Sequence, residues 1–234
     1  MDSADTSQKG SYITNLVRSA SPAHISSVDI LSRRAPPEEA SSPVTFNSFV
    51  EKDTAKWPAH IQSLAPPPSI YFSALATTRG NAGGFENQYK LEHDFNLELA
   101  KAAKANGIKT YVLISTANAN AKSSMGYMRM KGEIEDAVKA MDFDHTIILR
   151  PGLIAGHRQE SRPMEAPIRW IAAGLGAIST HYLKDPWAQE AEVIAKAAVS
   201  AALKAQNGEL KDKVVYMHGS EIIQYGRTGW KDLK

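Results

Sequence analysis

The chain has 234 residues, of which 43% are apolar and 22% charged, and its formal net charge is +2. This length fits one domain with a large core, and the mixed, nearly balanced charge gives no electrostatic case for nucleic acid as a partner. The absence of cysteine excludes disulfides, thiolate metal sites and a cysteine nucleophile. No apolar run approaches the roughly 18 residues of a membrane-spanning helix. His145 and His157 lack partners at metal-ligand spacing, so we predict no metal site.

The N-terminal segment combines features that point in different directions. Residues 1–10 are polar and predict a disordered tail, which leaves 11–234 as a single domain. The segment up to residue 40 is rich in Ser and Ala and carries several arginines, as mitochondrial presequences do. Asp2 and Asp5 oppose that interpretation, because presequences are poor in acidic residues. The composition therefore predicts no cleavable signal.

Strand-like and helix-like patterns alternate along the rest of the chain. The strongest helix pattern has Leu91, Phe95 and Leu99 on one face and ends at Asn106-Gly107. Segment 77–84 is rich in Thr, Asn and Gly, and this composition predicts a flexible polar loop. The predicted helices are 11–20, 57–64, 88–106, 127–141, 164–174 and 187–205, the predicted strands are 26–34, 44–50, 69–75, 110–115, 145–149 and 213–218, and a polar tail closes the chain.

This alternation predicts the fold class, an open parallel α/β sheet with helices on both faces. Ligands of such sheets bind beyond the carboxyl ends of the strands, where the loops gather. Six polar or turn residues follow these strand ends and are expected around one crevice: Thr77, Arg79, Ser115, Tyr127, Lys131 and Pro151.

Tyr127 and Lys131 are the strongest catalytic candidates in this set. Four residues apart on a helix, they share a face. A lysine ammonium beside a phenol stabilises the phenolate and lowers the tyrosine pKa, which makes the phenol a usable general acid or base. Ser115, at the end of the preceding strand, is placed to orient a substrate carbonyl. The competing interpretation is a chance spacing with an ordinary surface lysine.

Four strings of residues resemble one protein family. They are Ser73-Ala74-Leu75-Ala76-Thr77-Thr78-Arg79-Gly80, Lys131-Gly132-Glu133-Ile134-Glu135, Leu149-Arg150-Pro151-Gly152-Leu153 and Arg158-Gln159-Glu160-Ser161-Arg162-Pro163. They resemble the fungal "found in mitochondrial proteome" protein 52 family, related to the Tat-interacting tumour suppressor, an atypical short-chain dehydrogenase/reductase. The resemblance covers residues 10 to 234. It implies a Rossmann-like fold, bound NADPH and peripheral attachment to the mitochondrial outer membrane.

The chain departs from this family at its N-terminus. Such proteins open with an apolar strand and a Gly-x-x-Gly-x-x-Gly turn that receives the dinucleotide phosphates. Here only Gly10 matches, as the last glycine of that turn, and the first strand is missing. Three explanations stay open: a gene model with a wrong first exon, an isoform that has lost cofactor binding, or a tail that substitutes for the turn.

The resemblance also assigns cofactor-binding positions. Arg33 and Arg34 follow the second strand of the family, where basic residues suit the 2′-phosphate of NADP and a solvated turn is the alternative. Thr77 and Arg79 lie where family members pass beneath the cofactor, unless they belong to a simple loop. Pro151 completes the cofactor edge with Gly10.

Two functional hypotheses follow. The first is an atypical short-chain reductase, peripheral to the mitochondrial outer membrane, that uses NADPH to reduce a small carbonyl substrate. In it Tyr127 donates the proton, Lys131 lowers the Tyr127 pKa and Ser115 orients the carbonyl. The second is a non-catalytic binding or regulatory protein that keeps the fold and has lost the dinucleotide. The sequence leaves open whether the chain is an enzyme, and it does not define an oligomeric state.

Overall fold

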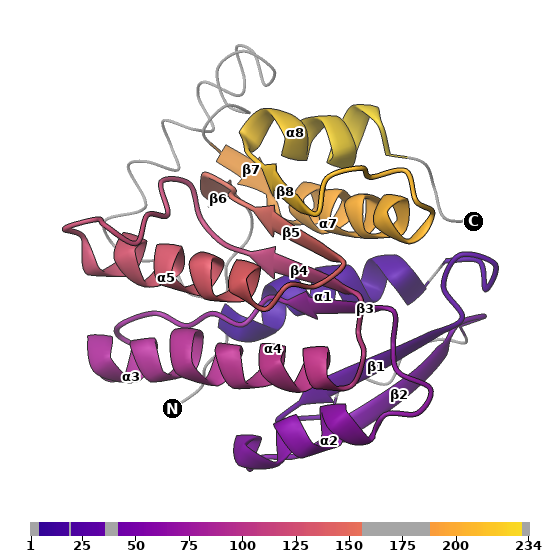
Figure 1. The fold of residues 1–234 in the computed structure, drawn as a ribbon, viewed down its shortest axis with the longest axis horizontal. Helices are drawn as coiled ribbons and strands as arrows, with labels where there is room; N and C mark the ends of the chain where they lie inside the picture. Colours follow the sequence, from indigo (N-terminus) through magenta and orange to yellow (C-terminus); the bar gives the residue numbers. More distant parts are fainter. Residues whose placement is uncertain (1–4, 19, 36–41, 156–187, 231–234) are drawn as a thin grey trace.

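The computed structural model describes residues 5–18, 20–35, 42–155 and 188–230 (Figure 1). The helices are α1 Asp5–Arg18, α2 Trp57–Ser63, α3 Phe85–Tyr89, α4 Asn96–Ala105, α5 Gly126–Ala140, α7 Ala191–Gln206 and α8 Gly219–Ile223, with π-helices at Lys90–Phe95 and Gln224–Thr228 and a short 3₁₀ turn at Thr54–Lys56. The strands are β1 Ser27–Ser32, β2 Thr45–Val50, β3 Ile70–Ser73, β4 Thr110–Ile114, β5 His145–Leu149, β6 Leu153–Ala155, β7 Ala188–Glu190 and β8 Val214–Met217.

The central sheet has four parallel strands in the order β3-β4-β5-β8. Its register aligns Ile70 with Thr110 and Ile114 with Leu149, so the strands end together at one edge. Strands β1 and β2 form a separate parallel pair, and so do β6 and β7. This arrangement confirms the predicted parallel α/β fold.

Side chains along the central strands point alternately to the two faces of the sheet and form part of a hydrophobic core on each face. Tyr111, Leu113 and Ile148 pack on one face against α2, α4 and α5. Val112 and Ile147 point to the opposite face, into the apolar cluster of α7 and α8. Helix α1 packs along α7 on that second face (Figure 1). The core strands are therefore buried on both sides, which explains their almost uninterrupted apolar sequences.

The central sheet and the β1–β2 pair share their helical layers without sharing hydrogen bonds. Val28 of β1 and Phe72 of β3 pack in one cluster with Ile13 of α1. Leu31 of β1 packs against the core on the opposite face. Yet in the described ranges β1 pairs only with β2, and β3 only with β4. The sheet is thus split at the position where the sequence predicts a missing strand.

Several element boundaries differ from the prediction. The predicted helix 187–205 was wrong at its start, because Ala188–Glu190 pairs with β6 and the helix begins only at Ala191. The prediction that a polar tail closes the chain was also wrong. Residues 219–228 are helical, and Ile222 and Ile223 of this segment are buried in the apolar cluster that includes α7.

Segment 77–84, predicted as a flexible loop, consists of hydrogen-bonded turns, including Ala82 N to Thr78 O and Gly84 N to Arg79 O at 2.9 Å each. Helix α1 begins at Asp5, inside the stretch assigned to a tail. The predicted helix 164–174 and the string Arg158–Pro163 lie outside the described residues.

Candidate functional site

The carboxyl edge of the central sheet carries most of the predicted site residues. Ser115 follows β4 directly, and its amide donates a 2.8 Å hydrogen bond to the carbonyl of Leu149, the last residue of β5. Pro151 is buried two residues beyond β5, and its carbonyl accepts a 2.7 Å bond from the amide of Ala117. The loops after β4 and β5 are thereby fixed to each other. The predicted convergence at this edge holds for these two residues.

Tyr127 and Lys131 lie in the first two turns of α5 but differ sharply in exposure. Tyr127 is 37% exposed, whereas Lys131 is 2% exposed. The ammonium of Lys131 lies 3.1 Å from Oε2 of Glu92 and forms an ion pair with it. Burial opposes the charge of this ammonium, but Glu92, with smaller contributions from Tyr127 and Glu135, outweighs it and raises the pKa of Lys131. Lys131 therefore stays charged, with a carboxylate as its neighbour.

Ser115 points its hydroxyl into a second buried ion-pair network. Its Oγ donates a 2.5 Å hydrogen bond to Oε1 of Glu135, a buried residue of α5. The same carboxylate receives Arg150 in a bidentate contact, with Nε 3.1 Å from Oε1 and Nη2 2.5 Å from Oε2. The Arg150 guanidinium lies 4.6 Å from the centre of the Tyr216 ring. The hydroxyl of Ser115 is thus engaged with protein groups rather than presented to solvent.

Thr77 and Arg79 lie in the turns that follow β3. Thr77 is buried, and its amide donates a 3.0 Å hydrogen bond to Oε1 of Glu92. Its carbonyl accepts from Nε2 of Gln88 at 3.0 Å. Arg79 is exposed. Glu92 therefore connects two of the predicted residues, Thr77 and Lys131.

The remaining cofactor candidates lie outside the central sheet, after β1 and in α1. Arg33 and Arg34 are exposed and directly follow β1, a strand of the two-stranded sheet. Gly10 lies six positions into the α1 helix, which begins at Asp5. Its amide therefore falls in the helical hydrogen-bond ladder, pointing along the helix toward residue 6.

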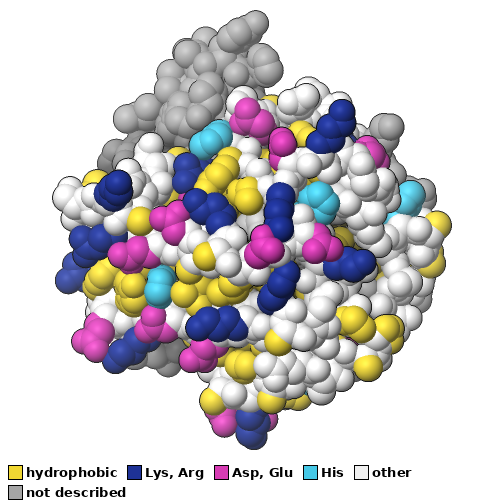
Figure 2. Space-filling model, viewed as in Figure 1, with side chains coloured by type: hydrophobic (Ala, Val, Ile, Leu, Met, Phe, Trp, Pro, Cys, Tyr) yellow, Lys and Arg dark blue, Asp and Glu magenta, His cyan; other side chains and the backbone are white. Residues whose placement is uncertain are grey.

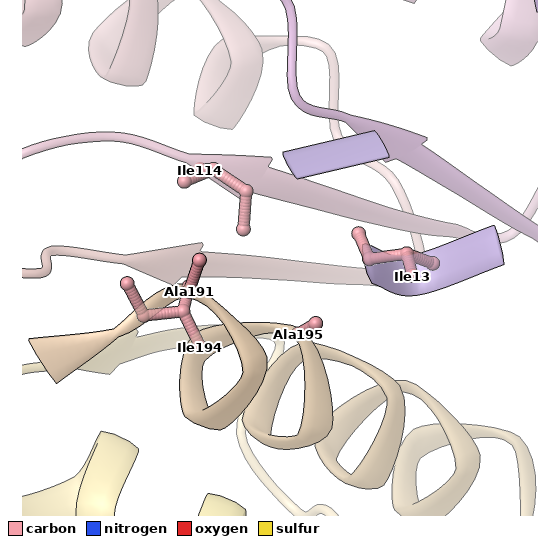
Figure 3. A pocket seen from close by; sticks show the side chains of 5 residues that line it. All are labelled: Ile13, Ile114, Ala191, Ile194 and Ala195. Carbon is pink, nitrogen blue, oxygen red and sulfur yellow. The ribbon is translucent and has the colours of Figure 1, made fainter. Parts of the chain in front are cut away.

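Where α1 faces the carboxyl end of β4, the surface is apolar. A small hollow there is lined by Ile13, Ile114, Ala191, Ile194 and Ala195, whose side chains Figure 3 shows gathered from α1, β4 and α7. None of these side chains offers a hydrogen-bond donor to a phosphate. The lining suits packing between helices and sheet.

These observations test whether the described residues fit a dinucleotide. In Rossmann-like proteins the pyrophosphate lies at a glycine-rich turn and the free amides of a helix N-terminus. Here Gly10 is inside the helix, and the hollow that Ile13 of the same helix lines is apolar. Lys131 is paired with Glu92 beneath the surface. The described residues do not fit the cofactor that the family resemblance implies.

Sequence reasoning missed the buried polar partners of this edge. Gln88, Glu92 and Asn96 are buried at four-residue spacing on one helical run. Oδ1 of Asn96 accepts from the hydroxyls of Ser73 at 2.7 Å and Tyr111 at 3.0 Å. The available signal was the four-residue spacing of these polar residues, which lie one position beyond the apolar stripe of Leu91 and Phe95.

Comparison with known proteins places the chain among characterised folds and sequences. No family model matches. Among solved structures, a UDP-N-acetylglucosamine 4-epimerase from Methanobrevibacter ruminantium has a TM-score of 0.61 at 18% identity, covering 90% of this chain and 73% of that one. MoeE5 in complex with UDP-glucose and NAD has a TM-score of 0.58 at 13% identity, covering 99% and 81%. These likenesses show that the fold is Rossmann-like.

Sequence relatives narrow the identification further. "Protein fmp52, mitochondrial" of Emericella nidulans is 54% identical over 227 residues, covering 95% of this chain and 96% of the relative. The Neurospora crassa protein fmp-52 is 41% identical over 226 residues, covering 95% and 93%. The chain belongs to this fmp52 family, whose compared members are named mitochondrial.

Proposed function

We propose that this chain is a non-catalytic member of its family, which keeps the Rossmann-like fold as a binding or regulatory protein of mitochondria without using a dinucleotide. One observation carries the proposal. The amide of Gly10, the single match to the phosphate-binding turn, is part of the α1 helix that begins at Asp5. A helical amide is already bonded to the carbonyl four residues earlier and has nothing left to donate to phosphate.

Calorimetric titration with NADPH and with NADH tests this proposal. The whole chain is expected to give no binding heat up to millimolar cofactor. A dissociation constant in the micromolar range would overturn it. The melting temperature with and without cofactor provides an independent check, because a ligand that binds only the folded state raises it.

A second candidate is NADPH-dependent reduction of a small carbonyl compound, with Tyr127 as the proton donor. It is favoured by the placement of Tyr127, which reaches solvent one helical turn before a charged Lys131. NAD in the solved structure of MoeE5 gives it indirect support. Its test is the Tyr127→Phe variant in a carbonyl-reduction assay. Turnover that disappears in the variant would favour this candidate, and turnover that persists would remove Tyr127 from the reaction.

We further propose peripheral attachment to the mitochondrial outer membrane. The mitochondrial names of the relatives support the organelle, and the family resemblance supports the outer membrane. Within the described ranges, no helix has the length and apolar character needed to cross a bilayer. On the face seen in Figure 2, basic and acidic side chains are mixed. Protease treatment of intact mitochondria should digest the protein, and alkaline carbonate should extract it. A protease-protected protein would contradict this location.

A further inference from the structure

Glu92 and Lys131 are opposite charges sealed from water on two different helices. The Glu92 side chain has no exposed surface, and that of Lys131 is 3% exposed. A buried charge without a partner is strongly unfavourable, so each of these groups depends on the other. The 3.1 Å contact therefore ties the π-helix Lys90–Phe95 to α5.

The second oxygen of Glu92 extends this tie to the turns after β3. Oε1 accepts hydrogen bonds from the amide of Thr77 at 3.0 Å and from Nε2 of Gln88 at 2.9 Å. Gln88 also donates a hydrogen bond to the Thr77 carbonyl, so Thr77, Gln88 and Glu92 are all bonded to one another. One carboxylate thus holds Lys131, the adjacent helical turn and the segment that begins at Thr77.

The backbone near Lys131 leaves little freedom for another arrangement. A Cβ atom placed on Gly132 would lie 2.1 Å from the Ala121 amide nitrogen and 2.3 Å from the Asn120 carbonyl carbon. Helix α5 is therefore in direct backbone contact with the loop after β4. The π-turn that carries Glu92 is a helical geometry found often at functional positions.

We propose that Glu92 and Lys131 form a structural clamp, which closes segment 77–84 against α3 and α5 and takes Lys131 away from the catalytic role suggested by the sequence. The inference deepens the proposed non-catalytic function and rests on it for the role of Lys131. Its test measures folding and local opening, so the clamp and the loss of dinucleotide binding can fail separately.

The test is a double-mutant cycle on the whole chain, with Lys131→Met, Glu92→Gln and the two combined. Lys131→Met leaves Glu92 buried without a counter-charge and should lower the melting temperature by about 10 °C. The double variant removes both charges and keeps an oxygen for the Thr77 amide. It should recover at least half of that loss. The matched control is Arg129→Met, two residues away on α5, whose ion pair with Glu133 is half-exposed and 3.9 Å long. It should change the melting temperature by no more than about 2 °C.

Amide hydrogen exchange gives the local readout. In Lys131→Met, exchange within residues 77–84 should rise roughly ten-fold, and the Arg129→Met control should leave it unchanged. If Lys131→Met fails to fold while the double variant folds, the clamp is supported. A Lys131→Met protein that melts like the Arg129→Met control, or a double variant that recovers nothing or does not fold, would overturn the proposal.

Discussion

At the scale of single residues, the string Lys131-Gly132-Glu133-Ile134-Glu135 has a physical explanation that requires no reaction. Lys131 and Glu135 form buried ion pairs with Glu92 and Arg150. Gly132 admits the backbone of the loop after β4, and Ile134 is fully buried in the core. Glu133 accepts a 2.9 Å hydrogen bond from Tyr89. The sequence resemblance singled out this string, but its partners are far away in sequence and only the fold identifies them.

Gly132→Ala is expected to destabilise the protein by about 1–3 kcal/mol, because the new methyl group would overlap backbone atoms that cannot rotate away. Chemical denaturation measures the change in the free energy of unfolding. Gly80→Ala is the control, since a Cβ there meets nothing closer than Thr78 Oγ1 at 3.9 Å. Equal stability of the two variants would contradict the close approach at Gly132.

Tyr89 provides a prediction on pH. Burial, followed by the hydrogen bond to Glu133, raises its pKa from 10.0 to about 12. Because the folded value lies above the unfolded one, the neutral phenol contributes stability that is full below pH 10 and is lost as the pH rises toward 12. The ultraviolet difference between wild type and Tyr89→Phe, followed as the pH rises, reports this ionisation. A transition near pH 10 would contradict both the burial of Tyr89 and its hydrogen bond to Glu133.

At the scale of elements, α5 is held to the end of β5 by Glu135 and Arg150. Glu135 is almost completely buried, and Arg150 is 22% exposed. Arg150→Met should lower the free energy of unfolding by about 2–4 kcal/mol, because among the described residues it leaves the buried Glu135 carboxylate bonded only to Ser115. The denaturation midpoint and slope measure this loss. An unchanged free energy of unfolding would mean that solvent already screens the ion pair of Glu135 and Arg150.

Element positions were predictable wherever local pattern and burial agree. The apolar runs of β4 and β5 and the amphipathic pattern of α5 predicted those elements within a residue or two. The β6–β7 pair was not predictable, because Leu153–Ala155 becomes a strand only by pairing with Ala188–Glu190. The site was harder still. The role of Glu92 depends on a π-turn and on contacts with residues 77 and 131, and none of these appears in a local pattern.

At the scale of the whole molecule, the split between β1 and β3 should govern how the protein unfolds. The β1–β2 pair has two strands, and isolated two-stranded sheets are marginally stable. Its edge, unpaired within the described ranges, also favours aggregation. Native-state hydrogen exchange should show amides of β1 and β2 opening at lower denaturant concentration than those of β4 and β5. A single sharp transition that includes all four strands would contradict this expectation.

Gly10, the residue aligned with the phosphate-binding turn, is part of helix α1, and we propose that this helix does not respond to a dinucleotide. Nuclear magnetic resonance of the Gly10 amide, recorded with and without millimolar NADPH, tests it most directly. We expect helical chemical shifts from Asp5 to Arg18 and no movement of the Gly10 signal when NADPH is added. A Gly10 amide outside the helix that shifts on titration with NADPH would contradict the proposed loss of dinucleotide binding.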